Sequence, residues 1–212
     1  MDFEQAIIFL TNGLKKPLPG QPAQKTMSPL PIDPRRFNFN FSESPKRGAV
    51  LILIYPDADE AFFPLIKRPV YAGVHSGQIA FPGGKMELED KDISYTAVRE
   101  AWEEVGVLPK DVRLLGQISD LFIPASNFLV SPIIGYTERK PDFVPEIKEV
   151  DRIIETPLKQ LLNLEIRKQK ILEIGGQFKL NTPYFDISNE VVWGATAMIL
   201  EEFIQVLENG RN

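Results

Sequence analysis

The 212-residue sequence contains no cysteine and only one histidine, His75. The absence of cysteine excludes disulfide bonds, thiol nucleophiles and cysteine-ligated zinc or iron–sulfur centres. A single histidine also excludes a metal centre built from several imidazoles. A bound metal must therefore be a hard cation held by oxygen atoms, such as Mg²⁺ or Mn²⁺.

Positive charge and long apolar runs are also scarce. The chain carries 24 basic and 29 acidic residues, a net charge of −5, which argues against a nucleic-acid partner. No stretch reaches the roughly 18 consecutive apolar residues that a membrane span needs. Residues 1–16 lack the basic leader of a signal peptide, so we expect a short helix docked on the domain. These observations predict a cytoplasmic protein without a membrane partner.

Proline is concentrated near the N-terminus, where residues 17–34 hold six of the 18 prolines. This composition predicts an extended connection without a helix or strand of its own. The segment is either a free linker or an arm lying across the domain surface, and apolar Met27 and Leu30 favour the arm. Such an arm could also cross to a second subunit and form a homodimer. We therefore divide the chain into an N-terminal helix and arm, residues 1–36, and one domain, residues 37–212.

The remaining sequence alternates between strand and helix patterns. Predicted strands lie at 48–55, 61–68, 112–119 and 128–136, and residues 77–84 predict a strand that leads into a glycine turn. A strand and short helix are predicted at 150–163, and a hairpin at 165–174 and 178–187. Amphipathic patterns predict helices at 93–106 and 195–209. This order of elements predicts an α/β (α+β) fold in which a mixed β-sheet is sandwiched between helices.

The helix predicted at 93–106 carries an unfavourable arrangement of charge. Spacings of three and four place Glu100, Glu103 and Glu104 on one face, where each like-charge pair costs roughly 0.2–0.5 kcal/mol. Gly106 is typical of a residue that ends a helix, so the acids also crowd the negative end of the helix dipole. The apolar stripe on the opposite side consists of Ala97, Val98, Ala101 and Val105. Bound divalent cations would remove the repulsion, which favours a functional role for the acids.

The segment FPGGKMELEDKDISYTAVREAWEEVGV, residues 81–107, resembles the Nudix box, the signature of hydrolases that cleave a nucleoside diphosphate linked to another moiety. The common box has a glutamate eight residues before the arginine, where this chain has Lys91, and Asp90 lies one residue further back. The turn therefore carries one extra residue. The matching residues are Gly84, Arg99, Glu100, Glu103, Glu104 and Gly106, with Ala101 and Val107 at the small and apolar positions.

The longer turn is similar to that of the coenzyme A pyrophosphatases of this superfamily. The upstream segment KRPVYAGVHSGQIAFPGG, residues 67–84, also resembles theirs. It departs at Gly73, where that subgroup has a second arginine, and at Ile66 and Pro69. The upstream matches are Arg68, His75, Gly77, Gln78 and the FPGG turn. The resemblance implies a Nudix-type fold and hydrolysis of coenzyme A or acyl-coenzyme A to 3′,5′-ADP and (acyl-)phosphopantetheine.

The resemblance also implies roles for individual residues. Glu100, Glu103 and Glu104 would hold Mg²⁺ or Mn²⁺, with a main-chain carbonyl at Gly84, or at its neighbour Gly83, completing the site. Arg99 would orient one glutamate through a charge-assisted hydrogen bond. For the base that deprotonates water, Glu100 is the first candidate and Glu149 the second.

Four further residues beside the glycine turn are expected to bind the phosphates of a small nucleotide substrate, namely Lys67, Arg68, His75 and Lys85. Two alternatives remain open. The same chemistry could act on ADP-ribose, NADH or nucleoside triphosphates. A protein of another class would keep the fold and bind a nucleotide without catalysis.

Overall fold

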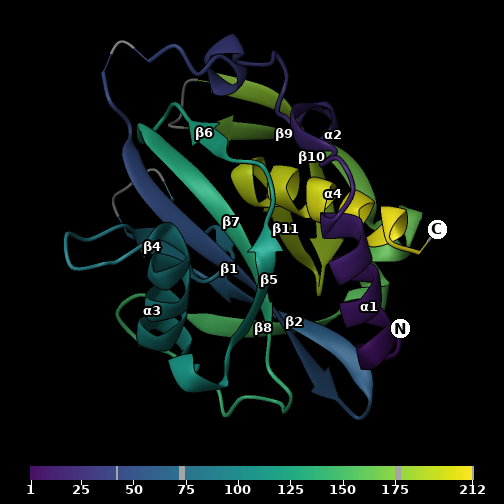
Figure 1. The fold of residues 1–212 in the computed structure, drawn as a ribbon. Coiled ribbons are helices and arrows are strands. Elements are labelled where there is room, and N and C mark those ends of the chain that lie inside the picture. The colour runs from purple at the N-terminus through teal and green to yellow at the C-terminus, as the bar shows by residue number, and fades with distance from the viewer. Residues whose placement is uncertain (42, 72–74, 175–177, 212) are drawn as a thin grey trace.

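The computed structural model describes residues 1–41, 43–71, 75–174 and 178–211, and these residues form an α+β fold (Figure 1). None of the helices in this part of the chain combines the length and the apolar character that crossing a membrane requires. The prediction of a mixed sheet between helices is confirmed.

The central sheet is built around two long parallel strands, β1 and β7. Residues 46–54 of β1 pair in parallel with residues 128–136 of β7, and the strand order is β3-β2-β1-β7-β5. Three short strands complete the sheet, because β4 pairs with β1, β6 with β7 and β8 with β2. The bounds are β1 Lys46–Asp57, β2 Glu60–Lys67, β3 Ile79–Ala80, β4 Gly83–Lys85, β5 Arg113–Gln117, β6 Leu121–Ile123, β7 Phe128–Tyr136 and β8 Arg152–Pro157.

The middle of strand β1, residues 49–55, is apolar because both faces of the sheet are covered there. Leu51 and Leu53 pack into a core beneath helix α3, Ile93–Val105. Ile52 and Ile54 point the other way, into a larger core shared with helices α1, Phe3–Leu14, and α4, Gly194–Asn209. Figure 1 shows α3 on one side of the sheet and α1 and α4 on the other. Successive side chains of a strand point to opposite faces of the sheet, so the leucines and the neighbouring isoleucines pack into different cores.

A second, three-stranded antiparallel sheet packs against α4. Its order is β11-β10-β9, and β9, Arg167–Ile174, and β10, Phe178–Ile187, form the hairpin that the sequence predicts. Strand β11, Glu190–Trp193, leads directly into α4 and was not predicted. The sequence also missed β6. The strand and glycine turn predicted within 77–84 correspond to β3 and to a turn whose glycines begin the short strand β4, which was not predicted.

Helix α3 begins and ends as the sequence predicts. The side chain of Asp92 accepts a hydrogen bond from the Tyr95 N–H and caps the first turn. Gly106 ends the helix with φ of +76°, a left-handed conformation that glycine adopts at little cost. This cap fixes the direction of the glutamate-bearing last turn.

The prediction that residues 17–34 contain no helix was wrong. Residues Gly20–Thr26 form helix α2, whose first turn accommodates Pro22 because the N–H groups of a first turn have no partner within the helix. The arm lies on the domain surface and packs on α4 of its own chain. Met27 is buried there, whereas Leu30 is 43% exposed, so only the first is an apolar anchor. Whether the arm also supports a homodimer stays a prediction.

Candidate functional site

A cleft of about 1310 Å³ brings together segments that are far apart in the sequence. One wall comes from the β3–β4 turn, helix α3 and Glu149. The opposite wall comes from the N-terminal arm, strands β9 to β11 and the start of α4. This volume exceeds the roughly 300–1,000 Å³ of a typical small-molecule site, so the cleft has room for a large nucleotide derivative.

The glycine turn and the last turns of α3 meet at one end of this cleft. The Gly83 N–H donates a hydrogen bond of 2.8 Å to Glu104 Oε2. A Cβ atom at position 84 would stand 2.4 Å from Glu100 Oε2, so only glycine allows this approach. The Gly83 carbonyl oxygen accepts from Arg68 Nη2 at 3.3 Å and faces the carboxylates. The Gly84 carbonyl instead points toward Gly48 of β1, which favours Gly83 over Gly84 as a carbonyl ligand.

Glu104 is the most buried acid of the site. Its exposed fraction is 1%, although the sequence pattern placed all three acids on the outer side of the helix. That prediction was wrong for Glu104, which faces the turn. Burial raises the pKa of Glu104 to about 7, although Arg68 and the Gly83 N–H act in the opposite direction. Burial likewise raises the pKa of Glu100, and Arg99 opposes that shift.

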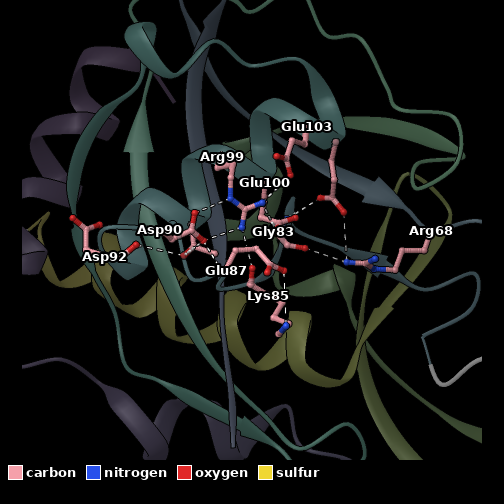
Figure 2. A network of polar contacts seen from close by, with 11 residues as sticks. Arg68, Gly83, Lys85, Glu87, Asp90, Asp92, Arg99, Glu100 and Glu103 are labelled. Atoms are coloured by element: carbon pink, nitrogen blue, oxygen red, sulfur yellow. Dashed lines mark hydrogen bonds and ion pairs between the residues drawn. The ribbon is translucent and has the colours of Figure 1, made fainter.

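Arg99 is the centre of the polar network drawn in Figure 2. Its Nη1 contacts Glu100 Oε1 at 3.0 Å and Glu103 Oε2 at 2.8 Å. Its Nη2 also donates to the Lys85 carbonyl at 3.0 Å, which ties the helix to the end of β4. The predicted role of Arg99 in orienting a glutamate is consistent with these contacts, which place two glutamates rather than one.

Asp90, the residue that marks the longer turn, supports Arg99 from the other side (Figure 2). Its carboxylate accepts from Arg99 Nε at 2.8 Å and from Nη2 at 2.9 Å. It also accepts from the Glu87 N–H and the Thr96 hydroxyl, and its side chain is 1% exposed. These donors hold the pKa of Asp90 well below its usual range, with the Arg99 contact as the largest cause. Asp90 therefore positions Arg99 rather than facing the cleft.

The donor set of this end fits a hard divalent cation. Only carboxylate and carbonyl oxygens are present, and the two buried carboxylates of Glu100 and Glu104 have raised pKa values that a cation would lower. As placed, no three acidic or histidine side chains of the described residues converge closely enough to hold a metal ion. Arg99 and Arg68 engage the carboxylates instead, and Glu103 is 48% exposed at its side chain. Metal binding therefore requires side-chain rotation away from the arginines.

The structure places most of the other predicted residues at the same cleft. Glu149, Arg68, His75 and Lys85 all line it. His75 Nδ1 lies 3.1 Å from Gln78 Oε1. Gly73, the departure noted upstream, lies outside the described residues.

Lys67 is not among the residues that line the cleft. Its Nζ lies 2.9 Å from Glu190 Oε1 on β11, and Arg152 contacts the same carboxylate. Lys67 thus ties strand β2 to the second sheet. No sequence pattern indicated this cluster, because Lys67, Arg152 and Glu190 belong to three strands that are far apart in the sequence.

Sequence reasoning also missed the residues on the arm side of the cleft, including Arg36 and Lys170. The only sequence signal near Arg36 is the PRRF segment, residues 34–37, which forms a single 3₁₀ turn. No motif marks Lys170, which lies in the alternating β9 strand. Their place in the same cleft as the glycine turn depends on how the arm and the hairpin pack around α4.

Comparison with known proteins places the chain in a family. The NUDIX domain matches residues 45–173. Nudix hydrolase 15, mitochondrial, of Arabidopsis thaliana is 36% identical over 184 residues, which cover 84% of this chain but only 62% of that protein. The Nudix hydrolase NudL of Photorhabdus laumondii is 32% identical over 180 residues, covering 84% of this chain and 92% of that protein. This chain thus spans less than two thirds of the Arabidopsis relative.

Solved structures agree on the fold. A MutT/nudix family protein from Enterococcus faecalis gives a TM-score of 0.52 at 14% identity, covering 81% of this chain and 65% of that one. The MutT protein from Methanosarcina mazei Go1 gives the same TM-score and identity, covering 82% of this chain and 100% of that one. At such identity the likeness concerns the fold alone. The sequence match, the mixed sheet and the box geometry together show that the chain belongs to the Nudix hydrolase family.

Proposed function

We propose that this protein hydrolyses the diphosphate linkage of a nucleoside-diphosphate derivative with the help of Mg²⁺ or Mn²⁺. The observation that carries the proposal is the meeting of Glu100 and Glu104 with the Gly83–Gly84 turn at one end of a large cleft. Both carboxylates are largely desolvated there, and the metal ligands that this end can offer are carboxylate and carbonyl oxygens. Such a set is suited to a hard cation and a polyanionic substrate.

A bound divalent cation neutralises the diphosphate and lowers the pKa of its bound water. Glu100, Glu104 and the Gly83 carbonyl would hold the cation, and Glu103 would join them after leaving Arg99. Asp90 keeps Arg99 charged and fixed beside these carboxylates. Arg68, which contacts both Glu104 and the Gly83 carbonyl, is placed to bind a phosphate oxygen once the cation takes over its partners.

The general base is proposed to be Glu100, with Glu149 as the second candidate. Both line the cleft, and Glu149 is exposed in the turn that precedes β8. Glu149 acts electrostatically on Glu100 and Glu104, raising the pKa of each. Comparing the pH dependence of turnover in Glu149→Gln and Glu100→Gln would assign the base, because loss of the base removes the acidic limb of the profile.

For the substrate we propose coenzyme A or its thioesters, giving 3′,5′-ADP and (acyl-)phosphopantetheine. The upstream segment around Arg68 and His75, which resembles that subgroup, lines the cleft. An apolar portion of the cleft fits an uncharged pantetheine or acyl chain better than a second ribose. Its lining side chains include Phe128, Leu172, Leu180, Val191 and Trp193.

A substrate panel tests this proposal. Coenzyme A, acetyl-coenzyme A, ADP-ribose, NADH and a nucleoside triphosphate are incubated with the protein in Mg²⁺ or Mn²⁺, and the products are resolved by chromatography. We expect the highest kcat/KM for a coenzyme A compound, with 3′,5′-ADP as product. Preference for ADP-ribose, NADH or the triphosphate would support the proposed diphosphate hydrolysis and reject coenzyme A as the substrate. Tight nucleotide binding without any product would favour a binding protein.

A further inference from the structure

The arm side of the cleft is held in place by a buried polar network. Glu202 of α4 is fully buried and its carboxylate accepts from Gln24 Nε2 at 2.7 Å and from the Gly20 N–H at 3.1 Å. The Ser119 N–H donates to the same carboxylate at 3.1 Å. Leu30 then bridges to Asn181 of β10. The arm is thus fixed to the domain at residues 20, 24 and 30, ahead of the turn that carries Arg36.

The Arg36 guanidinium has no hydrogen-bonded or ion-paired acceptor among the described residues, although the charge of Asp33 acts on it without direct contact. Its Nη1 atom is shielded from solvent and has no hydrogen-bond partner, and no ion pair of Arg36 occurs among the described residues. Asp33, the nearest acid in the sequence, is occupied by Arg35, whose Nη2 lies 2.7 Å from Oδ2. Burial lowers the pKa of Arg36. A partly desolvated guanidinium that lacks an acceptor is costly unless an anion compensates it.

The charges that line this side leave a positive surplus. Lys170 of β9 faces the Tyr184 ring, with Nζ 5.5 Å from its centroid, and forms no ion pair among the described residues. Glu173, the acid near it on β9, pairs with Lys179 at 3.0 Å. The acids that line this side, Asp33, Glu173 and Glu190, each pair with a neighbouring cation. Arg36 and Lys170 line the cleft without an ion pair among the described residues.

We propose that Arg36 and Lys170 form a second anion subsite, which binds a phosphate monoester of the substrate remote from the scissile diphosphate. This inference rests on the proposed function, since it assumes that the diphosphate is bound at the acidic end of the same cleft. The planar guanidinium of Arg36 can engage two phosphate oxygens at once, and Lys170 adds a point charge. The subsite makes the protein selective for nucleoside-diphosphate compounds that carry an additional phosphate.

Matched substrate pairs that differ by one phosphate monoester test the subsite. Coenzyme A is compared with 3′-dephospho-coenzyme A, and NADPH with NADH, using the wild-type protein, Arg36→Gln, Arg36→Lys and Lys170→Gln. Arg113→Gln, which removes an exposed arginine paired with Glu138, is the matched control. Far-UV circular dichroism and thermal unfolding establish that each variant is folded.

We expect Arg36→Gln to lower kcat/KM about 10- to 100-fold for the phosphate-bearing member of each pair, mainly through KM. The member without the phosphate should change by less than about twofold, as should both members in Arg113→Gln. Lys170→Gln should give a smaller loss in the same direction, and Arg36→Lys should restore part of the selectivity. Equal losses for both members, or no loss for either, would overturn the subsite.

Direct binding separates failure of the subsite from failure of the proposed function. Titration calorimetry without metal compares 3′,5′-ADP with 5′-AMP on the wild-type protein and on Arg36→Gln. If no compound of the panel is hydrolysed but 3′,5′-ADP binds more tightly and loses this advantage in Arg36→Gln, the function fails and the subsite stands. If hydrolysis occurs and 3′,5′-ADP shows no advantage, the function stands and the subsite fails.

Discussion

The two ends of the cleft differ in charge and in the way the chain builds them. At the acidic end, Glu100 and Glu104 come from one helix and the glycine turn comes from the strand before it. At the opposite end, Arg36 comes from the arm and Lys170 from a hairpin far along the chain. One end has an excess of carboxylates and the other an excess of cations. We propose that a substrate with a diphosphate and a second phosphate matches both ends, since the carboxylates would hold a cation at the first and Arg36 would bind the second.

The two ends also differ in how their charged side chains are paired and hydrogen-bonded. The carboxylates are held by arginines, and Asp90 in turn holds Arg99. Arg36 has no comparable support and relies on the fixed backbone of the arm. A strongly connected hydrogen-bond network holds the reactive side chains in one geometry. A side chain without such bonds, like that of Arg36, can change its rotamer when a ligand binds. On this contrast we propose that catalysis occurs at the acidic end and that the arm end selects the substrate.

The largest effect on turnover is expected from a substitution at the acidic end of the cleft. Glu104→Gln removes a charge that a cation requires, so turnover should fall about 10²- to 10³-fold. Both members of each matched substrate pair should be affected equally, because the arm end is intact. Steady-state kinetics in Mn²⁺ measures this, with exposed Glu138→Gln as the control. A variant that retains wild-type turnover would contradict the assignment.

Adding a side chain at Gly84, beside Glu100, should have the next largest effect. In Gly84→Ala, the added Cβ would stand 2.4 Å from Glu100 Oε2 and displace that carboxylate. We expect roughly a 10²-fold loss of kcat, because small misplacements of reacting groups have effects of that size. Gly116→Ala is the control, since its Cβ meets only the flexible end of Leu14 at 3.2 Å. Equal activity of the two variants would show that Glu100 tolerates displacement.

The support of Arg99 should be visible in stability. Asp90→Asn breaks a buried ion pair and should lower the free energy of unfolding by roughly 3 kcal/mol near neutral pH. Because folding lowers the pKa of Asp90, its stabilisation is complete above the unfolded pKa of about 4 and is lost as pH falls through the folded value. Urea unfolding of both proteins should therefore show a difference that shrinks in acid. A difference that grows in acid would reject this account.

The smallest expected effect concerns the arm. Glu202→Gln replaces an acceptor of three hydrogen bonds and should lower the free energy of unfolding by about 1–2 kcal/mol. Loosening the arm should raise KM several-fold for the phosphate-bearing member of each substrate pair and leave KM unchanged for the member without that phosphate. Glu208→Gln, at an exposed position on the same helix, is the control. An equal rise in KM for both members would show that the arm does not contribute to substrate selectivity.

Patterns of short range predicted the parts of the molecule that depend on neighbouring residues. The limits of α3 followed from Asp92 and Gly106, and β7 was predicted at the residues that form it. Helix α2 was missed because proline content was counted without regard to position in the first turn. Lys67 was assigned to substrate because its ion partner, Glu190, lies on a strand that the sequence did not reveal.

The sequence by itself determined the family, the carboxylate-bearing helix and the glycine turn, because spacing within a helix and its adjoining turn fixes geometry over a few residues. Tertiary structure alone decided that Glu104 is buried, that Asp90 holds Arg99 and that Arg36 faces the same cleft. Burial and pairing arise when segments distant in the chain pack together, and no local pattern encodes which segments will meet.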